Sequence, residues 1–115
     1  MHEMGIILHL AKSLEETAAQ ENIKKITRVT LEVGEVSGIM TDYFVDCWNY
    51  FRARHPVLDT AELELEMLPA VTWCDSCKKT YPTVQYGRTC PHCGSGETWL
   101  LKGSECIIKE IEVED

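Results

Sequence analysis

Apolar side chains recur at helical spacing near the start of the chain, and polar residues such as Lys12 and Glu16 occupy the positions between them. The apolar positions are Ile6, Ile7, Leu10, Leu14 and Ala18. This series follows the 3.6-residue period of an amphipathic helix. The pattern therefore predicts a helix over roughly residues 3–21 with one buried face.

A second helical pattern follows Thr41, whose side chain is of the type that caps helix N-termini. Pro56 limits this helix downstream, because proline cannot continue the backbone hydrogen bonding of a helix. The apolar positions lie at i, i+3, i+4 and i+7 and are Phe44, Cys47, Trp48 and Phe51. We expect these side chains to pack into the same core as the first helix.

Three segments alternate between apolar and polar residues, as strands with one buried face do. Their apolar positions are Val29, Leu31 and Val33, then Leu63, Leu65 and Met67, and finally the less regular Ile107, Ile111 and Val113. Thr30 is among the positions expected to face solvent. Three strands and two helices on one face make a stable small layer. The sequence therefore predicts an α+β fold with a three-stranded sheet and two helices.

The composition changes between Ala70 and Gly103. This segment contains four cysteines and four glycines, and its four basic and two acidic side chains give it a charge of +2, whereas the whole chain carries −8. We interpret residues 70–103 as an inserted, zinc-ribbon-like module. Residues 1–69 and 104–115 then form the α+β domain.

Neither a signal peptide nor a membrane span is expected, because His2 and Glu3 open the chain in place of a basic stretch and no long apolar run follows. We therefore expect a cytoplasmic protein. Cytoplasmic thiols stay reduced, so paired cysteines there indicate a metal site before a disulfide framework.

The cysteines of the module form two C-x-x-C pairs, Cys74 with Cys77 and Cys90 with Cys93, and 12 residues separate the pairs. Each pair can present two thiolates, at about 2.3 Å, to one tetrahedral zinc ion. Four cysteine ligands leave no open position for catalysis, so we predict a structural site. Thiolates also hold iron, which stays as the alternative metal.

Two function classes are disfavoured by composition and motifs. A charge of −8 repels phosphate backbones, so a nucleic acid is not an expected partner. The chain has no nucleophile elbow, phosphate-binding glycine loop or H-E-x-x-H pattern, so we do not expect an enzyme.

The first three residues, Met1, His2 and Glu3, place an imidazole beside a terminal amine and two backbone amides. Deprotonated nitrogens of this kind, together with imidazole, suit tetragonal nickel(II) or copper(II). An exposed histidine at such a position is more often only solvated. The first residues are thus a candidate metal site on chemistry alone.

Several stretches together resemble the HypA/HybF family of [NiFe]-hydrogenase maturation proteins. They are Met1-His2-Glu3-Met4, Val29 to Gly38, both cysteine pairs, and Gly103 to Glu114. The resemblance implies a nickel metallochaperone that binds Ni(II) through His2 and neighbouring backbone nitrogens, and zinc through the four cysteines. It also implies that nickel passes to the [NiFe]-hydrogenase large subunit with the help of a partner GTPase.

One part of the family pattern is missing. Family members can have a loop carboxylate just after the position of Gly38, whereas this chain has Ile39 and Met40 there, and its first acid is Asp42. The fourth nickel ligand is therefore left open. The sequence also leaves open which enzyme receives the nickel, hydrogenase alone or also urease, and whether the chain forms a homodimer. The alternative function is a zinc-stabilised interaction adaptor with no nickel delivery of its own.

Overall fold

The computed structural model describes residues 3–114, which fall into two compact units. The first unit comprises Met1–Leu31, Ile39–Leu65 and Ile108–Asp115, and the second comprises Glu32–Gly38 and Glu66–Ile107. The second unit thus contains a stretch from the first half of the chain. These units are defined by their internal contacts and not by the metal that each binds. The predicted division into a zinc module of residues 70–103 and a nickel domain formed by the remainder therefore stays a prediction.

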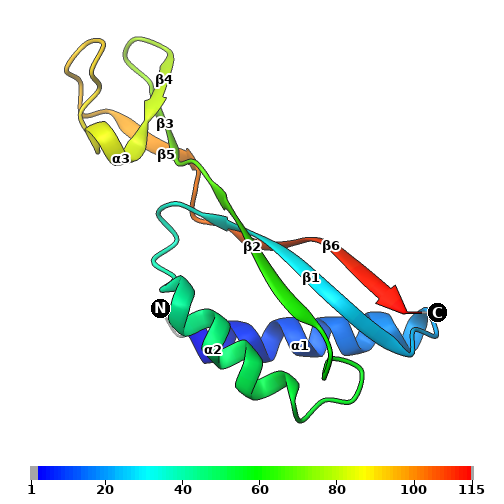
Figure 1. The fold of residues 1–115 in the computed structure, drawn as a ribbon. Coiled ribbons are helices and arrows are strands. Elements are labelled where there is room, and N and C mark those ends of the chain that lie inside the picture. Colours follow the sequence, from blue (N-terminus) through cyan, green and yellow to red (C-terminus); the bar gives the residue numbers. More distant parts are fainter. Residues whose placement is uncertain (1–2, 115) are drawn as a thin grey trace. The chain divides into compact units, whose positions relative to one another are not determined.

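Two helices form one layer of the first unit, α1 (Glu3–Gln20) and α2 (Thr41–Arg52), and Figure 1 shows both on the same side of a sheet. The predicted apolar faces are the buried ones. They consist of Ile7, Leu10, Leu14 and Ala18 on α1, joined by Ala11, and of Phe44, Cys47 and Trp48 on α2. Both predicted helices are therefore confirmed.

The start of α2 differs from the expectation. Thr41 is the first residue of the helix, and Met40 occupies the N-cap position with no hydrogen bond from its own side chain to the helix end. Instead, the carboxylate of Glu3 accepts a hydrogen bond from the Met40 N–H, at 3.0 Å. A side chain distant in sequence thus accepts the N–H of the N-cap residue, which is one of the donors at a helix start that have no partner within the helix.

The sheet consists of β1 (Lys25–Gly34), β2 (Glu62–Leu68) and β6 (Cys106–Glu114), in the order β2-β1-β6. The predicted α+β class, with three strands and two helices, is confirmed. The predicted alternation was wrong at several positions: Thr30, on the central strand, is 2% exposed, whereas Met67, Ile107 and Val113 are 55%, 49% and 42% exposed. Alternation tells which residues share a face of a strand, but packing decides which faces and ends are covered.

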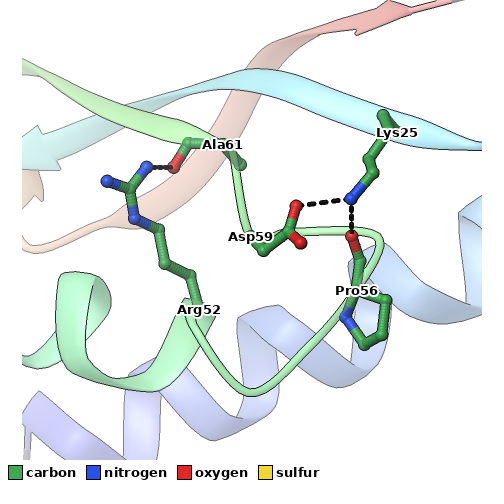
Figure 2. Close-up of polar contacts among 5 residues, drawn as sticks. All are labelled: Lys25, Arg52, Pro56, Asp59 and Ala61. Atoms are coloured by element: carbon green, nitrogen blue, oxygen red, sulfur yellow. Dashed lines mark hydrogen bonds and ion pairs between the residues drawn. The ribbon is translucent and has the colours of Figure 1, made fainter.

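Side chains from a helix and a strand fasten the loop between α2 and β2 (Figure 2). Arg52 donates from Nη1 to the Ala61 carbonyl oxygen at 2.6 Å. Lys25 donates from Nζ to the Pro56 carbonyl oxygen at 2.6 Å and pairs with Asp59 at 2.5 Å. These bonds satisfy loop carbonyl groups that the sheet does not pair.

The second unit holds a small antiparallel sheet, β3 (Val71–Cys74), β4 (Lys79–Pro82) and β5 (Thr98–Lys102), in the order β4-β3-β5. Strands β3 and β4 form a hairpin with Cys77 in its turn. β4 ends at Pro82, because proline lacks the N–H that a continued strand needs, and a short helix follows, α3 (Thr83–Tyr86).

Backbone hydrogen bonds join three segments at the base of this unit. Gly34 donates to the Glu105 carbonyl oxygen at 2.7 Å, and Val36 donates to that of Gly103 at 2.8 Å. The Glu35 carboxylate accepts the N–H of Ala70 at 2.9 Å. Residues 32–38 therefore belong structurally with the cysteine segment.

Within residues 3–114, no helix combines the length and the apolar character that a membrane crossing requires.

Candidate metal centre

The two cysteine pairs lie in turns of the same design. The carbonyl oxygen of Cys74 accepts the N–H of Lys78 at 2.9 Å, and that of Cys90 accepts the N–H of Gly94 at 2.8 Å. Both donors have a positive φ, 60° at Lys78 and 76° at Gly94. Such a turn directs both side chains of a C-x-x-C pair to the same side of the backbone. Lys78 adopts a conformation that glycine adopts at lower cost.

The four sulfur atoms come together although 12 residues separate the pairs. All four lie within 4.8 Å of one another, with Sγ–Sγ distances of 3.6 Å between Cys74 and Cys93 and 3.7 Å between Cys77 and Cys90. A tetrahedral zinc ion with bonds of about 2.3 Å requires sulfur separations of about 3.8 Å. The cluster therefore fits a four-coordinate zinc ion.

Hydrogen bonds and burial act on the thiols in opposite directions. The backbone N–H of Cys77 lowers the pKa of Cys74 to about 7, while burial raises the pKa of Cys77 to about 12. The N–H of His92 donates to Cys90 Sγ at 3.3 Å. One thiolate thus forms readily near neutral pH. A bound cation would be needed to hold all four thiols deprotonated.

The cluster is also the core of its unit. Cys74 and Cys90 are buried together with Tyr81, whose hydroxyl donates to the Gly87 carbonyl oxygen at 2.8 Å. Ser76 and Ser95 form a hydroxyl pair at 2.7 Å that joins the segments around the two turns. So few apolar side chains cannot stabilise a fold of this size alone, and a metal ion would supply the missing stability.

The candidate nickel residues are described only in part. Met1 and His2 lie outside the described residues. Glu3 is 7% exposed and, as noted, binds the Met40 N–H, whereas Asp42 is exposed in the first turn of α2. Among residues 3–114, the four cysteines are the one group of three or more metal-ligating side chains in reach of a single ion.

Sequence reasoning missed the contact between Glu3 and Met40. These residues are 37 positions apart, and no motif connects a carboxylate at the start of one helix with the N-cap of another. The matched turns at Lys78 and Gly94 could have been found, because both residues follow the second cysteine of a C-x-x-C pair directly.

The fold and the cluster define the class of protein: a small α+β metal-binding protein with a closed four-cysteine module. Residues 1–113 match the family model described as "Hydrogenase/urease nickel incorporation, metallochaperone, hypA". The chain therefore belongs to the HypA family of nickel metallochaperones, which are maturation factors and not enzymes. The resemblance noted in the sequence is confirmed.

Individual relatives support this membership. The chain is 34% identical over 114 residues to the hydrogenase maturation factor HypA of Albidiferax ferrireducens, covering 99% of this chain and 100% of that one. It is 30% identical over 114 residues to the hydrogenase maturation factor HybF of Klebsiella pneumoniae, again covering 99% of this chain and 100% of that one. The solution structure of the Ni metallochaperone HypA from Helicobacter pylori matches with a TM-score of 0.76 at 26% identity, covering 98% and 97% of the two chains.

Proposed function

We propose that this protein binds Ni(II) through His2, supported by the nitrogens of Met1 and Glu3, and delivers it to the large subunit of a [NiFe]-hydrogenase with a partner GTPase. The observation that carries the proposal is the family match over residues 1–113, which includes this segment. The nickel ion is cargo and must leave, so a weak site on the first residues suits the task. Reduced cysteines and the absence of catalytic motifs fit a cytoplasmic carrier.

The proposed role of Glu3 is limited by its side-chain contacts. Its carboxylate already accepts the Met40 N–H and is nearly inaccessible to solvent. We therefore assign nickel binding to the backbone nitrogen of Glu3, while its carboxylate holds the start of α1 against the start of α2. Asp42 is exposed and lies two residues after Met40, and we do not assign it as a nickel ligand.

The resident metal is proposed to be zinc, held by Cys74, Cys77, Cys90 and Cys93. The sulfur separations of 3.6 and 3.7 Å and the all-cysteine donor set support it. Iron suits the same donors. Zinc would supply structure and no chemistry at this site, because four protein ligands leave no position for a substrate.

Metal analysis of untagged protein tests the proposal. Nickel should bind stoichiometrically to the wild type and not to His2→Ala, while zinc content stays at about one per chain in both. His9→Ala is the matched control, since His9 is an exposed histidine on α1 and should not change nickel binding. Wild-type protein that retains zinc but binds no nickel would favour the interaction adaptor.

The recipient is proposed from the relatives' names, which refer to hydrogenase maturation. The family description also includes urease. Nickel transfer to an immature hydrogenase large subunit, with and without the GTPase, distinguishes a direct from an assisted delivery. Sedimentation analysis of the same samples determines whether the carrier is a monomer or a homodimer.

A further inference from the structure

A cavity of about 580 Å³ opens on the second unit, and none of the four cysteines lines it. Its volume lies in the range of sites that bind small ligands or peptide side chains. Strands β3 and β5, the short helix α3 and the segment after β1 contribute to its walls, with side chains that include Val36, Thr72, Thr83, Arg88, Trp99 and Leu100.

The polar part of the lining suits an anion. Arg88 is exposed and its guanidinium forms no ion pair or hydrogen bond with any residue in 3–114, and no acidic side chain lines the cavity. Thr72 and Thr83 form a hydroxyl pair at 2.6 Å, which uses one of their two O–H donors and leaves the other for a ligand. A guanidinium pairs with carboxylates through two parallel hydrogen bonds.

The apolar part lies along a strand at the edge of its sheet. β5 pairs with β3 and has no second neighbour in the order β4-β3-β5. Trp99 is 51% exposed and Leu100 38% exposed, although both are large apolar side chains. An edge strand with exposed apolar side chains can receive an extended peptide as an added strand.

We propose that this cavity is a docking site for an extended segment of a partner protein, in which a carboxylate side chain binds Arg88 and a neighbouring aliphatic side chain packs against Trp99 and Leu100. The cavity is complementary to an anion although the whole chain is acidic, because Arg88 is the single charged residue in its lining and has no carboxylate partner among residues 3–114. A peptide explains the exposed strand edge beside the cavity, which a small carboxylate alone would not use. None of the four cysteines is among the lining residues of the cavity, and neither is Glu3 or Asp42.

The test is an NMR titration of the zinc-loaded full-length protein with the acetylated, amidated peptide Glu-Leu-Glu-Val-Glu. Saturable shifts are expected at the Trp99 indole and the Leu100 amide. Arg88→Gln should weaken binding about tenfold, the loss expected for hydrogen bonds to a charged group. Lys79→Gln, on exposed β4 and outside the cavity, is the matched control and should bind as the wild type does.

Four outcomes would overturn the proposal. Absence of saturable shifts at millimolar peptide excludes the site, and equal weakening by Arg88→Gln and Lys79→Gln reduces the effect to general charge attraction. If the peptide Glu-Ser-Glu-Ser-Glu binds as tightly as Glu-Leu-Glu-Val-Glu, the aliphatic side chains do not contribute, and the cavity binds only a carboxylate. A wild-type dimer that Arg88→Gln dissociates, detected by sedimentation, identifies the occupant as a second copy of this chain.

Discussion

Gly34 packs directly against the backbone of Gly103, so that a Cβ atom at position 34 would lie 2.0 Å from the carbonyl oxygen of Gly103. Gly103 in turn has a φ of 121°, and its own Cβ would lie 2.4 Å from the Cβ of Ala70. These contacts hold the end of β1 against the two segments that lead into and out of the cysteine sheet. The atoms nearest to position 34 all belong to the backbone, so no flexible side chain can move aside to make room.

Gly34→Ala should therefore destabilise the protein by about 2–3 kcal/mol, which is the cost of overpacking a site that cannot relax. The measurement is thermal unfolding of the zinc-loaded protein. Gly96→Ala is the matched control, because nothing lies within 4 Å of its Cβ and its φ is not in the left-handed region. Equal stability of the two variants would contradict the close contact.

Cys77→Ala should release the metal from the four-cysteine cluster. Removing one ligand costs the binding free energy that stabilises the second unit, so residues 70–103 should become sensitive to protease while the helices persist. Zinc content and limited proteolysis measure the two effects. Cys106→Ala is the control, since Cys106 lies on β6 outside the cluster, and full zinc retention by Cys77→Ala would refute the assignment.

Glu3→Ala should lower stability by about 1–2 kcal/mol, because the Met40 N–H loses its carboxylate acceptor at the start of α2. Hydrogen exchange at the Met40 amide should accelerate. Glu3→Gln keeps an oxygen acceptor and should lose less stability than Glu3→Ala. Glu16 is exposed on the same helix, so Glu16→Ala should leave the stability nearly unchanged. Unchanged exchange in Glu3→Ala would show that the hydrogen bond does not hold the helix end.

The Glu105 carboxylate predicts a dependence of stability on pH. Backbone N–H groups, its own and that of Gly103 at 2.6 Å, lower the pKa of Glu105 below its usual value. A lowered pKa means that the fold favours the ionised form, so this contribution is present above pH about 4.3 and is lost as the pH falls through the folded-state pKa. Glu105→Gln should flatten the acid limb of the stability curve, whereas Glu110→Gln, exposed on β6, should leave it unchanged. Identical acid limbs in wild type and Glu105→Gln would contradict this role.

Local patterns were sufficient for the helices and for the grouping of the cysteines. The apolar period of α1 depends only on neighbouring residues, and a C-x-x-C turn presents two sulfurs through its own backbone geometry, as the Lys78 and Gly94 turns do. The pairing of two such turns also follows from chemistry, because one tetrahedral ion needs four thiolates. These features were therefore predictable from short stretches of sequence.

Features that depend on distant contacts could not be predicted. The burial of Thr30 follows from the central place of β1 in the sheet, and the capping of α2 by Glu3 from the packing of two helix ends. The membership of residues 32–38 in the second unit depends on the approach of Gly34 to Gly103. Glycine in a strand indicates a close approach but does not identify the partner.

The proposed nickel site predicts an effect of position in the chain as well as of residue type. Residues added before Met1 should impair nickel binding even though His2 is retained. An extension converts the terminal amine into an amide, whose nitrogen must lose a proton before it can bind, and it adds bulk beside the metal. Affinity should fall without loss of structure, because a buried Glu3 fixes the start of α1 in both proteins.

Nickel titrations of protein that starts at Met1 and of protein with a short Gly-Ser extension make the comparison, with zinc content and the helical signal as controls for folding. A second control places the same extension after Asp115, where the length of the chain changes but the terminal amine does not. Equal nickel affinity of the native and N-terminally extended proteins would show that the amine is not a ligand. His2 would then remain a candidate, and the remaining donors would have to come from internal amides or from carboxylates such as Asp42. Loss of affinity in the N-terminally extended protein alone would support the amine as a ligand, because residues 1–115 are the same in the three proteins.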